Sequence, residues 1–201
     1  HSLDWVSSNY DEKYNKEKPI VFNTLQCYRW DRLAYLKKMH QSAKEKGYKL
    51  GFKVVRGAYM EKENERADER DYQSPICPNK KATDDHFNEV VAYILNNLDD
   101  ISLFLGSHNE QSSYLAMDLM EQLGIKKSDR RVWFGQLYGM SDHITYNLAE
   151  AGYNVAKYIP FGPVKDVMPY LIRRAEENTS VAGQTSRELE LLKRERTRRG
   201  L

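Results

Sequence analysis

The sequence predicts an α/β fold built around a parallel sheet. Apolar, β-branched or aromatic runs recur along the chain, and each is followed by a segment with helical periodicity. Strands that alternate with helices pair in parallel, because each helix returns the chain to the same edge of the sheet. Periodicity does not distinguish an open sheet from a closed barrel. The five predicted strand regions are Ile20–Tyr28, Leu50–Tyr59, Ile101–His108, Arg131–Leu137 and Asn154–Phe161.

The helical segments between these runs have recognisable ends. The first carries an apolar stripe from Leu33 to Ala43 and is expected to stop at Gly47. The second has its apolar stripe over residues 87–98, with Thr83 as the expected N-cap and the next two residues, both aspartates, in its first turn. The other three are expected over residues 110–123, over 141–152, and from Pro163 onward.

The chain is predicted to have three parts. Residues 1–19 are interpreted as the end of a preceding helix and a polar connection, 20–185 as the main α/β part, and 186–201 as a charged terminal helix. The basic end of that helix is expected to be solvated, with contact to acidic lipid or a partner as the alternative. The chain starts His-Ser-Leu without an initiator Met, so we expect this start to be an internal point of a longer protein.

The composition excludes several classes of protein. A net charge of +2 over 201 residues gives no reason to expect nucleic-acid binding, and no run approaches the length of a membrane-spanning helix. Cys27 and Cys77 lack metal-ligand spacing and are interpreted as buried or idle thiols in a reducing compartment. His108 has no second histidine or carboxylate at ligand spacing, so no metal site is expected and a hydrogen-bonding histidine is favoured.

Polar or aromatic residues stand where each predicted strand ends. Ligands of α/β proteins sit at the carboxyl ends of the strands, so this recurrence predicts a site to which every strand contributes. The residues are Gln26, Tyr28, Arg56, Tyr59, His108, Asn109, Gln136, Tyr138 and Tyr158.

Two features of the second strand region have a functional and a structural interpretation. Lys53 lies inside an apolar run, where it either points at a ligand or extends its ammonium group out to solvent. Arg56-Gly57-Ala58 allows the backbone to approach a phosphate or a flavin ring, but a strand-to-loop turn needs the same glycine. No complete GxGxxG or phosphate-loop pattern accompanies it.

The stretch YLIRRAEEN, residues 170–178, places four polar residues on one helix face. Tyr170, Arg173, Arg174 and Glu177 follow helical spacing. Such a face can simply be solvated, with Arg173 and Glu177 forming an i,i+4 pair worth a few tenths of a kcal/mol. Alternatively, the two guanidinium groups bind a carboxylate.

These motifs, taken in order, resemble the proline dehydrogenase family, whose members are flavin-dependent (βα)8 barrels of the TIM type that oxidise L-proline. The resemblance covers about residues 20–185 and implies a partial barrel, with strands four to eight and the eighth helix. The segments that carry it are LQCY at 25–28, KVVRGAY at 53–59, KATDD at 81–85, SHN at 107–109, QLYGM at 136–140, KYIPFG at 157–162 and YLIRRAEEN.

The resemblance also implies roles for individual residues. Arg173 and Arg174 would bind the proline carboxylate, and Lys53 would stand near flavin N5, with Lys53 and Tyr59 as the catalytic residues. The substrate ring would be packed by Tyr59, Tyr158, Tyr170 and Leu137, and the presence of Tyr158 favours proline over hydroxyproline. The implied FAD contacts are Gln26, Lys53, Val55, Arg56, Gly57, Thr83, His108, Asn109 and Glu177.

The implied reaction is hydride transfer from proline to FAD, which gives Δ1-pyrroline-5-carboxylate and passes electrons to a quinone. The expected location is the cytoplasm of a bacterium, with peripheral contact at the inner membrane, or the mitochondrion of a eukaryote. The alternatives are another (βα)8 enzyme, such as a lyase or aldolase with Lys53 as a Schiff-base lysine, and a non-catalytic binding scaffold.

Two departures from the family pattern lead to further expectations. No segment corresponds to the first three barrel strands, which supply a lysine and an aspartate to the substrate pocket in the family. Five strands cannot close an eight-stranded barrel, so this chain alone is expected to have little or no activity and to need the missing part. Pro169 should kink the last helix or mark a restart before the arginines.

Overall fold

The computed structural model describes residues 9–180 and 182–200, except for the side chains at 173–188. The chain forms two compact units. The first comprises His1–Gln136 and Asp142–Lys157, and the second comprises Leu137–Ser141 and Tyr158–Leu201.

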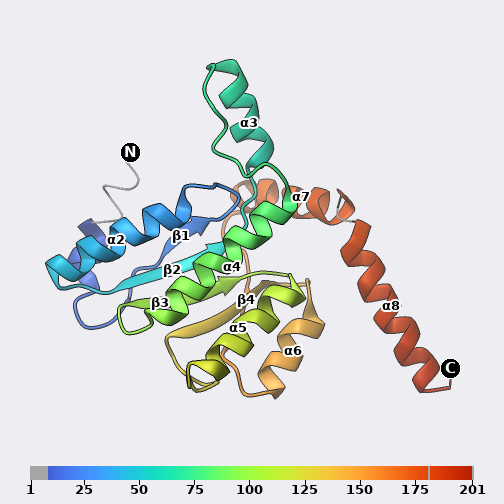
Figure 1. The fold of residues 1–201 in the computed structure, drawn as a ribbon. Coiled ribbons are helices and arrows are strands. Elements are labelled where there is room, and N and C mark those ends of the chain that lie inside the picture. The colour runs from blue at the N-terminus through green and yellow to red at the C-terminus, as the bar shows by residue number, and fades with distance from the viewer. Residues whose placement is uncertain (1–8, 181, 201) are drawn as a thin grey trace. The chain divides into compact units, whose positions relative to one another are not determined.

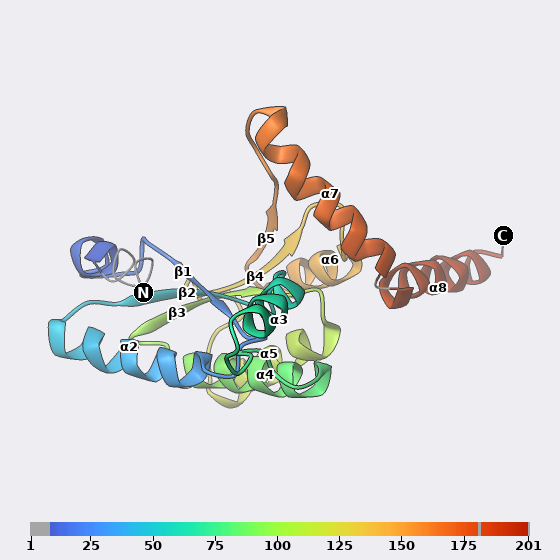
Figure 2. The ribbon, with the colours of Figure 1, turned by 90° about the horizontal axis from the view of Figure 1, so that it is seen from above.

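The five predicted strands are present, and they form one sheet in which the strand order follows the sequence (Figures 1 and 2). The pairs from the first to the fourth strand are parallel, as predicted. Each strand is shorter than its predicted run, because the apolar pattern continues into the loop that follows. The strands are β1 Asn23–Gln26, β2 Leu50–Val55, β3 Ile101–Gly106, β4 Val132–Leu137 and β5 Val155–Tyr158.

Helices follow the strands in the predicted alternation. Gly47 ends the first of them in the left-handed conformation with a φ of 70°, and its N–H donates to Ala43, as the sequence predicts. Residues 9–14 are also helical, and the prediction that residues 1–19 are the end of a preceding helix and a connection stays a prediction. The helices are α2 Arg32–Lys46, α3 Met60–Glu69, α4 Lys80–Asn96, α5 Glu110–Gln122, α6 Asp142–Glu150, α7 Val164–Ser180 and α8 Ala182–Arg198.

The core of the first unit lies between one face of the sheet and its helices. Alternate strand residues point to opposite faces, and those on the helix side are almost completely buried, including Phe52, Val54, Leu103 and Phe134. Helices α2, α4 and α5 lie on this same side of β1–β3 (Figure 2). We call the opposite side of β1–β3 the open face. Burial of each large apolar side chain contributes about 2 kcal/mol to folding, so the helix face holds the unit together.

The prediction for the start of α4 was wrong. The helix begins at Lys80, and its N-cap is Asn79, whose side-chain oxygen accepts a 2.8 Å hydrogen bond from the backbone N–H of Ala82. Thr83 instead lies inside the helix, where its hydroxyl donates to the carbonyl oxygen of Asn79 at 3.3 Å. Asp84 and Asp85 therefore stand beyond the first turn. Asparagine caps a helix as well as threonine does, and the earlier cap adds one turn.

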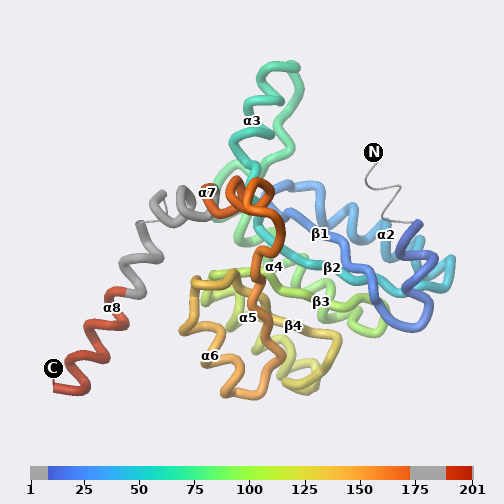
Figure 3. Tube along the Cα trace, turned by 180° about the vertical axis from the view of Figure 1, so that it is seen from behind, coloured from blue at the N-terminus to red at the C-terminus, as the bar shows by residue number. Residues whose placement is uncertain are grey.

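Helix α3 was not predicted. It is charged along most of its length, and Ala67 is its one buried residue, so the sequence shows no apolar stripe that would indicate a packed helix. The helix projects from the rest of the first unit (Figures 1 and 3). Backbone hydrogen bonds fix its base: the N–H of Trp30 donates to Pro75 at 3.1 Å, and the N–H of Cys77 donates to Tyr28 at 2.7 Å.

The predicted effect of Pro169 is corrected in part. Helix α7 continues from Val164 through Pro169 without a restart before the arginines. Proline lacks the N–H that would bond the carbonyl of Lys165, so the helix has one hydrogen bond fewer at this point. The terminal charged helix is present as predicted, but α8 begins at Ala182 rather than at residue 186.

Candidate functional site

Three of the predicted cofactor residues share the open face of the sheet. Gln26 pairs in register with Val55, and Thr24 pairs with Lys53. The strand alternation that buries Phe52 and Val54 against the helices therefore turns Lys53 and Val55 the other way. A cation, an amide and an aliphatic side chain are thus neighbours at the carboxyl end of β1 and β2.

Gly57 follows β2 at a point of close packing. Its φ of +120° is one that L-residues rarely adopt, and a β-carbon there would collide with the ring of Tyr28. The same β-carbon would lie 3.1 Å from the side-chain oxygen of Gln26. Tyr28 is buried. The turn and its packing are sufficient reason for this glycine, whatever else it approaches.

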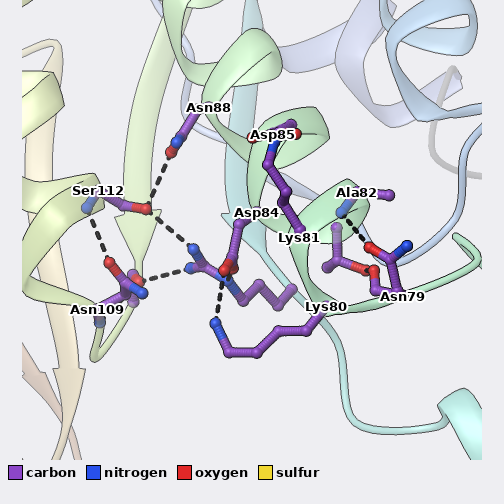
Figure 4. Close-up of polar contacts among 12 residues, drawn as sticks. Asn79, Lys80, Lys81, Ala82, Asp84, Asp85, Asn88, Asn109 and Ser112 are labelled. Atoms are coloured by element: carbon purple, nitrogen blue, oxygen red, sulfur yellow. Dashed lines mark hydrogen bonds and ion pairs between the residues drawn. The ribbon is translucent and has the colours of Figure 1, made fainter.

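Arg56 is the centre of a polar network at the carboxyl edge of the sheet. Its Nε donates to Asp84 at 2.6 Å, and its two terminal nitrogens donate to the hydroxyls of Ser107 and Ser112, each at 3.0 Å. The guanidinium carbon also lies 4.3 Å from the ring centroid of Phe87. The residue therefore joins the end of β2 to α4 and α5, and Figure 4 labels its partners Asp84 and Ser112.

The turn after β3 carries the predicted His108 and Asn109. Ser107 accepts a 3.1 Å hydrogen bond from the N–H of Asn109, whose own side-chain oxygen caps α5 by accepting from the N–H of Ser112 at 2.9 Å. Asn109 is thus a helix cap in addition to its predicted role. His108 is partly buried.

Gln136 is one of the strand-end residues from which the sequence predicts a site to which every strand contributes, but its side chain is occupied by protein partners. It is buried on the helix side of β4, where it donates to the carbonyl of Ser107 at 3.3 Å and accepts from the hydroxyl of Thr145 at 2.9 Å. Both ends of its amide have protein partners, so it holds the turn after β3 to helix α6. Strand alternation decides this, because Gln136 is two residues from the buried Phe134.

Burial and charge pairing shift the pKa values of several groups near this edge. Burial of Asp84 opposes its ionisation, but hydrogen bonds from Lys80 and Arg56 outweigh it, and the pKa of the carboxyl group is lowered. Burial raises the pKa of Cys27 to about 12, and it also raises that of Cys77. Both thiols are free and buried, which agrees with the interpretation of idle cysteines.

The second unit contains the predicted aromatic pair. The ring centroids of Tyr158 and Tyr170 are 5.8 Å apart, with the rings tilted by 58°. Tyr158, at the end of β5, also accepts a 3.0 Å backbone hydrogen bond from Tyr138. Leu137, the last residue of β4, is partly buried. In the first unit, Tyr59 is the N-cap residue of α3 and is 40% exposed.

The paired arginines are on α7, as predicted, together with Glu177. Their side chains lie outside the described residues, so the predicted carboxylate and cofactor contacts of Arg173, Arg174 and Glu177 stay predictions.

Sequence reasoning missed the residues that surround Arg56. Asp84, Ser107 and Ser112 were not assigned a role in the site, although Asp84 and Ser107 belong to motifs that carry the family resemblance. The separation of Asp84 from Arg56 along the chain gives no local pattern that would pair them. Ser107 and Ser112 are buried beside the carboxyl edge of the sheet, and this burial can be recognised only once the fold is known.

Metal-binding clusters and membrane spans are both absent from the described part of the chain. Over the described ranges, no three histidine, cysteine or acidic side chains gather in a way that could hold a metal ion. Among the same residues, no helix is long and apolar enough to cross a membrane.

A parallel α/β sheet with charged and amide side chains at its carboxyl edge is the arrangement found in ligand-binding α/β enzymes. Comparison with known proteins then identifies the family. The family model described as proline dehydrogenase matches residues 1–187, and the chain belongs to the proline dehydrogenase family.

Three relatives show how far the similarity extends. Proline dehydrogenase 1, mitochondrial, of Homo sapiens is 44% identical over 204 residues, which cover 98% of this chain and 34% of the human protein. Hydroxyproline dehydrogenase of Xenopus laevis is 41% identical, with 98% of this chain and 43% of that protein covered. The crystal structure of proline utilization A from Bdellovibrio bacteriovorus, inactivated by N-propargylglycine, has a TM-score of 0.81 at 29% identity, over 90% of this chain and 19% of that one.

These matches also define what portion of the fold is present. The chain spans about a third of the length of the human relative. Its five-stranded parallel sheet matches part of the (βα)8 barrel of the proline utilization A proteins, as the family resemblance implies.

Proposed function

We propose that the protein oxidises L-proline to Δ1-pyrroline-5-carboxylate, with FAD as the hydride acceptor and a quinone as the next electron acceptor. Family membership supports the reaction. The structural observation that supports it most is the placement of Lys53 beside Gln26 and Val55 on the open face, at the carboxyl end of the sheet. A cation in that position suits a ring system that gains negative charge on reduction.

The residues at this edge fit a flavin dinucleotide in chemical type. Arg56 offers a guanidinium, and the backbone N–H groups at the start of α5 offer the positive end of a helix dipole, both of which suit phosphate. When bound, FAD supplies the hydride acceptor. The proposed contacts are Gln26, Lys53, Val55, Arg56, Gly57, Thr83, His108, Asn109 and Glu177.

The proposed substrate residues position proline and do not react with it covalently. Arg173 and Arg174 form bidentate bonds to the carboxylate, while the rings of Tyr59, Tyr158 and Tyr170 pack against the pyrrolidine together with Leu137. Holding both ends of a small substrate aligns its reacting C–H bond, and positioning of this kind supplies much of the rate in two-substrate chemistry. The contact between Tyr158 and Tyr170 supports this proposal for the ring side.

The test is reduction of a dye by L-proline in the presence of added FAD, with the protein extended to the length of its relatives. We expect proline-dependent reduction, flavin absorbance bands in the purified protein, and a lower rate with hydroxyproline, since Tyr158 fills the space near the ring. Borohydride trapping of a carbonyl substrate on Lys53, with no flavin bound, would instead support the lyase or aldolase alternative. Replacing the dye with a quinone tests the proposed electron acceptor. A vesicle-binding assay tests the proposed peripheral membrane contact.

A further inference from the structure

Asp84 holds two cations at once. Its Oδ1 accepts from Nε of Arg56 at 2.6 Å, and its Oδ2 accepts from Nζ of Lys80 at 2.5 Å. The side chains of Asp84 and Arg56 are each 24% exposed, so their ion pair is mostly shielded from water. Shielding makes such a charge-assisted bond stronger and more directional than an exposed pair.

Asp84 fixes the orientation of the Arg56 guanidinium. The Nε bond sets one edge of the guanidinium plane, and Phe87 packs against it at 4.3 Å. Ser107 and Ser112 then accept from the two terminal nitrogens. Three of the five N–H groups of Arg56 take these described partners.

The network extends from Arg56 to the turn after β3, which carries the proposed cofactor residues His108 and Asn109. The hydroxyl of Ser107 accepts from both Arg56 and the backbone N–H of Asn109, so it couples the guanidinium to the turn that carries His108. The hydroxyl of Ser112 donates to Asn88 of α4 at 2.9 Å while it accepts from Arg56. A change at Asp84 therefore reaches two segments that are proposed to touch the cofactor.

We propose that Asp84 is a positioning residue for cofactor binding. It holds Arg56, and through Ser107 the turn at His108 and Asn109, in the geometry that binds the cofactor before the cofactor arrives. The inference rests on the proposed function in one respect, since it takes FAD as the ligand of this edge. Asp84 itself is not proposed to touch FAD or substrate.

Asp85 is a matched control in the same helix. It pairs with Lys81 at 2.6 Å in the same i,i+4 spacing that joins Lys80 and Asp84, and its side chain is 55% exposed. Figure 4 shows the two aspartates in adjacent positions of α4, with their lysines one turn earlier. Both aspartates form an i,i+4 ion pair with a lysine of the helix, but of the two it is Asp84 that also bonds Arg56. The difference between Asp84→Ala and Asp85→Ala therefore isolates the contact with Arg56.

The experiment uses the protein at the length of its relatives, with Asp84→Ala, Asp84→Asn and Asp85→Ala compared with the wild type. FAD affinity is measured by titrating flavin-free protein and following flavin fluorescence. We expect Asp84→Ala to weaken FAD binding roughly ten- to hundredfold, the range for loss of one charge-assisted hydrogen bond. Asp84→Asn keeps an acceptor for Nε but loses the charge, so its affinity should be intermediate. Asp85→Ala should bind FAD like the wild type.

A second readout needs no flavin. Hydrogen exchange of the backbone amides at residues 107–112 is followed in the flavin-free proteins. Asp84→Ala should speed exchange there because Ser107 and Ser112 lose their fixed donor, and Asp85→Ala should not. The KM for proline at saturating FAD should stay unchanged in Asp85→Ala.

The inference is overturned if Asp84→Ala binds FAD and exchanges its amides like Asp85→Ala. If Asp84→Ala does not fold, Asp84→Asn takes its place in the comparison, and wild-type affinity in that variant overturns the inference as well. A wild-type protein that binds FAD without oxidising proline would refute the proposed function, while the comparison of the two aspartates would still decide this inference.

Discussion

Gly57 and Tyr28 are packed so closely at the end of β2 that the glycine cannot carry a side chain without displacing the ring. Gly57→Ala would combine that collision with a φ of +120°, which strains any L-residue. We expect the free energy of unfolding to fall by about 3 kcal/mol. Urea unfolding measures this change.

The control for Gly57 is Gly47, which also has a positive φ, of +70°, but where an added β-carbon would meet nothing within 4 Å. Gly47→Ala should cost about 1 kcal/mol, from the backbone conformation alone. Equal losses in the two variants would show that Tyr28 moves aside freely and that packing is not the reason for Gly57.

Arg173 and Arg174 carry the predicted recognition of the substrate carboxylate. Arg173→Met and Arg174→Met keep much of the side-chain length but remove the guanidinium fork, so each should raise the KM for proline about a hundredfold. The kcat should fall less, because the flavin site is unchanged. Steady-state kinetics at saturating FAD separates the two effects.

Arg194 of α8 serves as the control for the paired arginines. It forms an exposed i,i+4 ion pair with Glu190 at 2.6 Å, so Arg194→Met should leave the KM for proline unchanged. A wild-type KM in both Arg173→Met and Arg174→Met would instead support a solvated face and a non-catalytic scaffold.

Helix α2 is tied to the sheet by a charge cluster at the amino ends of the strands. Asp100 accepts from Lys49 at 2.8 Å and contacts buried His40 at 3.2 Å. The hydrogen bond from Lys49 is the largest cause that lowers the pKa of Asp100. Burial raises this pKa, but the hydrogen bonds from Lys49 and His40 outweigh burial and bring the pKa to about 2. In the unfolded chain Asp100 is protonated near pH 3.8, its ordinary pKa, whereas in the folded chain it is protonated near pH 2. Stability from this group is therefore present above about pH 4 and is lost as the pH falls towards about 2.

Asp100→Asn tests this contribution of the helix–sheet contact. The variant should be less stable than the wild type at about pH 6, and the gap should narrow as the pH falls from about 4 to about 2. Thermal unfolding over that range measures it. Asp99→Asn is the control, because the Asp99 side chain is 95% exposed and pairs only with Arg131 among the described contacts. A gap that stays constant with pH would contradict the assignment.

The molecule as described contains an open five-stranded sheet, with β1 at one edge and β5 at the other. A closed barrel of the family type needs eight strands, and the aligned region covers 34% of the human relative. We therefore expect this chain alone to reduce dye with proline at a small fraction of the rate of the extended protein. The first three barrel strands of the family, to which no segment of this chain corresponds, can be supplied as a separate polypeptide. Adding that polypeptide should restore part of the activity. A rate from this chain alone equal to that of the extended protein would refute the expectation.

The alternation of strands and helices was predictable from residues such as Phe87, Val90 and Leu103, because burial on one side imposes a fixed period on the sequence. The order of the motifs also sufficed to predict the family. Helix α3 was not predicted because it projects from the core and buries only Ala67. Its sequence therefore has no apolar periodicity that would indicate a helix.

Contacts between distant segments could not be obtained from periodicity. Asp84 pairs with Arg56 because the parallel register and the crossover helices bring these two residues together. The same arrangement puts the ring of Tyr28 where a β-carbon at position 57 would lie. Gln136 turned away from the ligand side for a similar reason, since its direction depends on which face of β4 the helices cover. Local sequence patterns report how much of an element is buried, whereas the partners of a buried polar group depend on how the whole sheet is assembled.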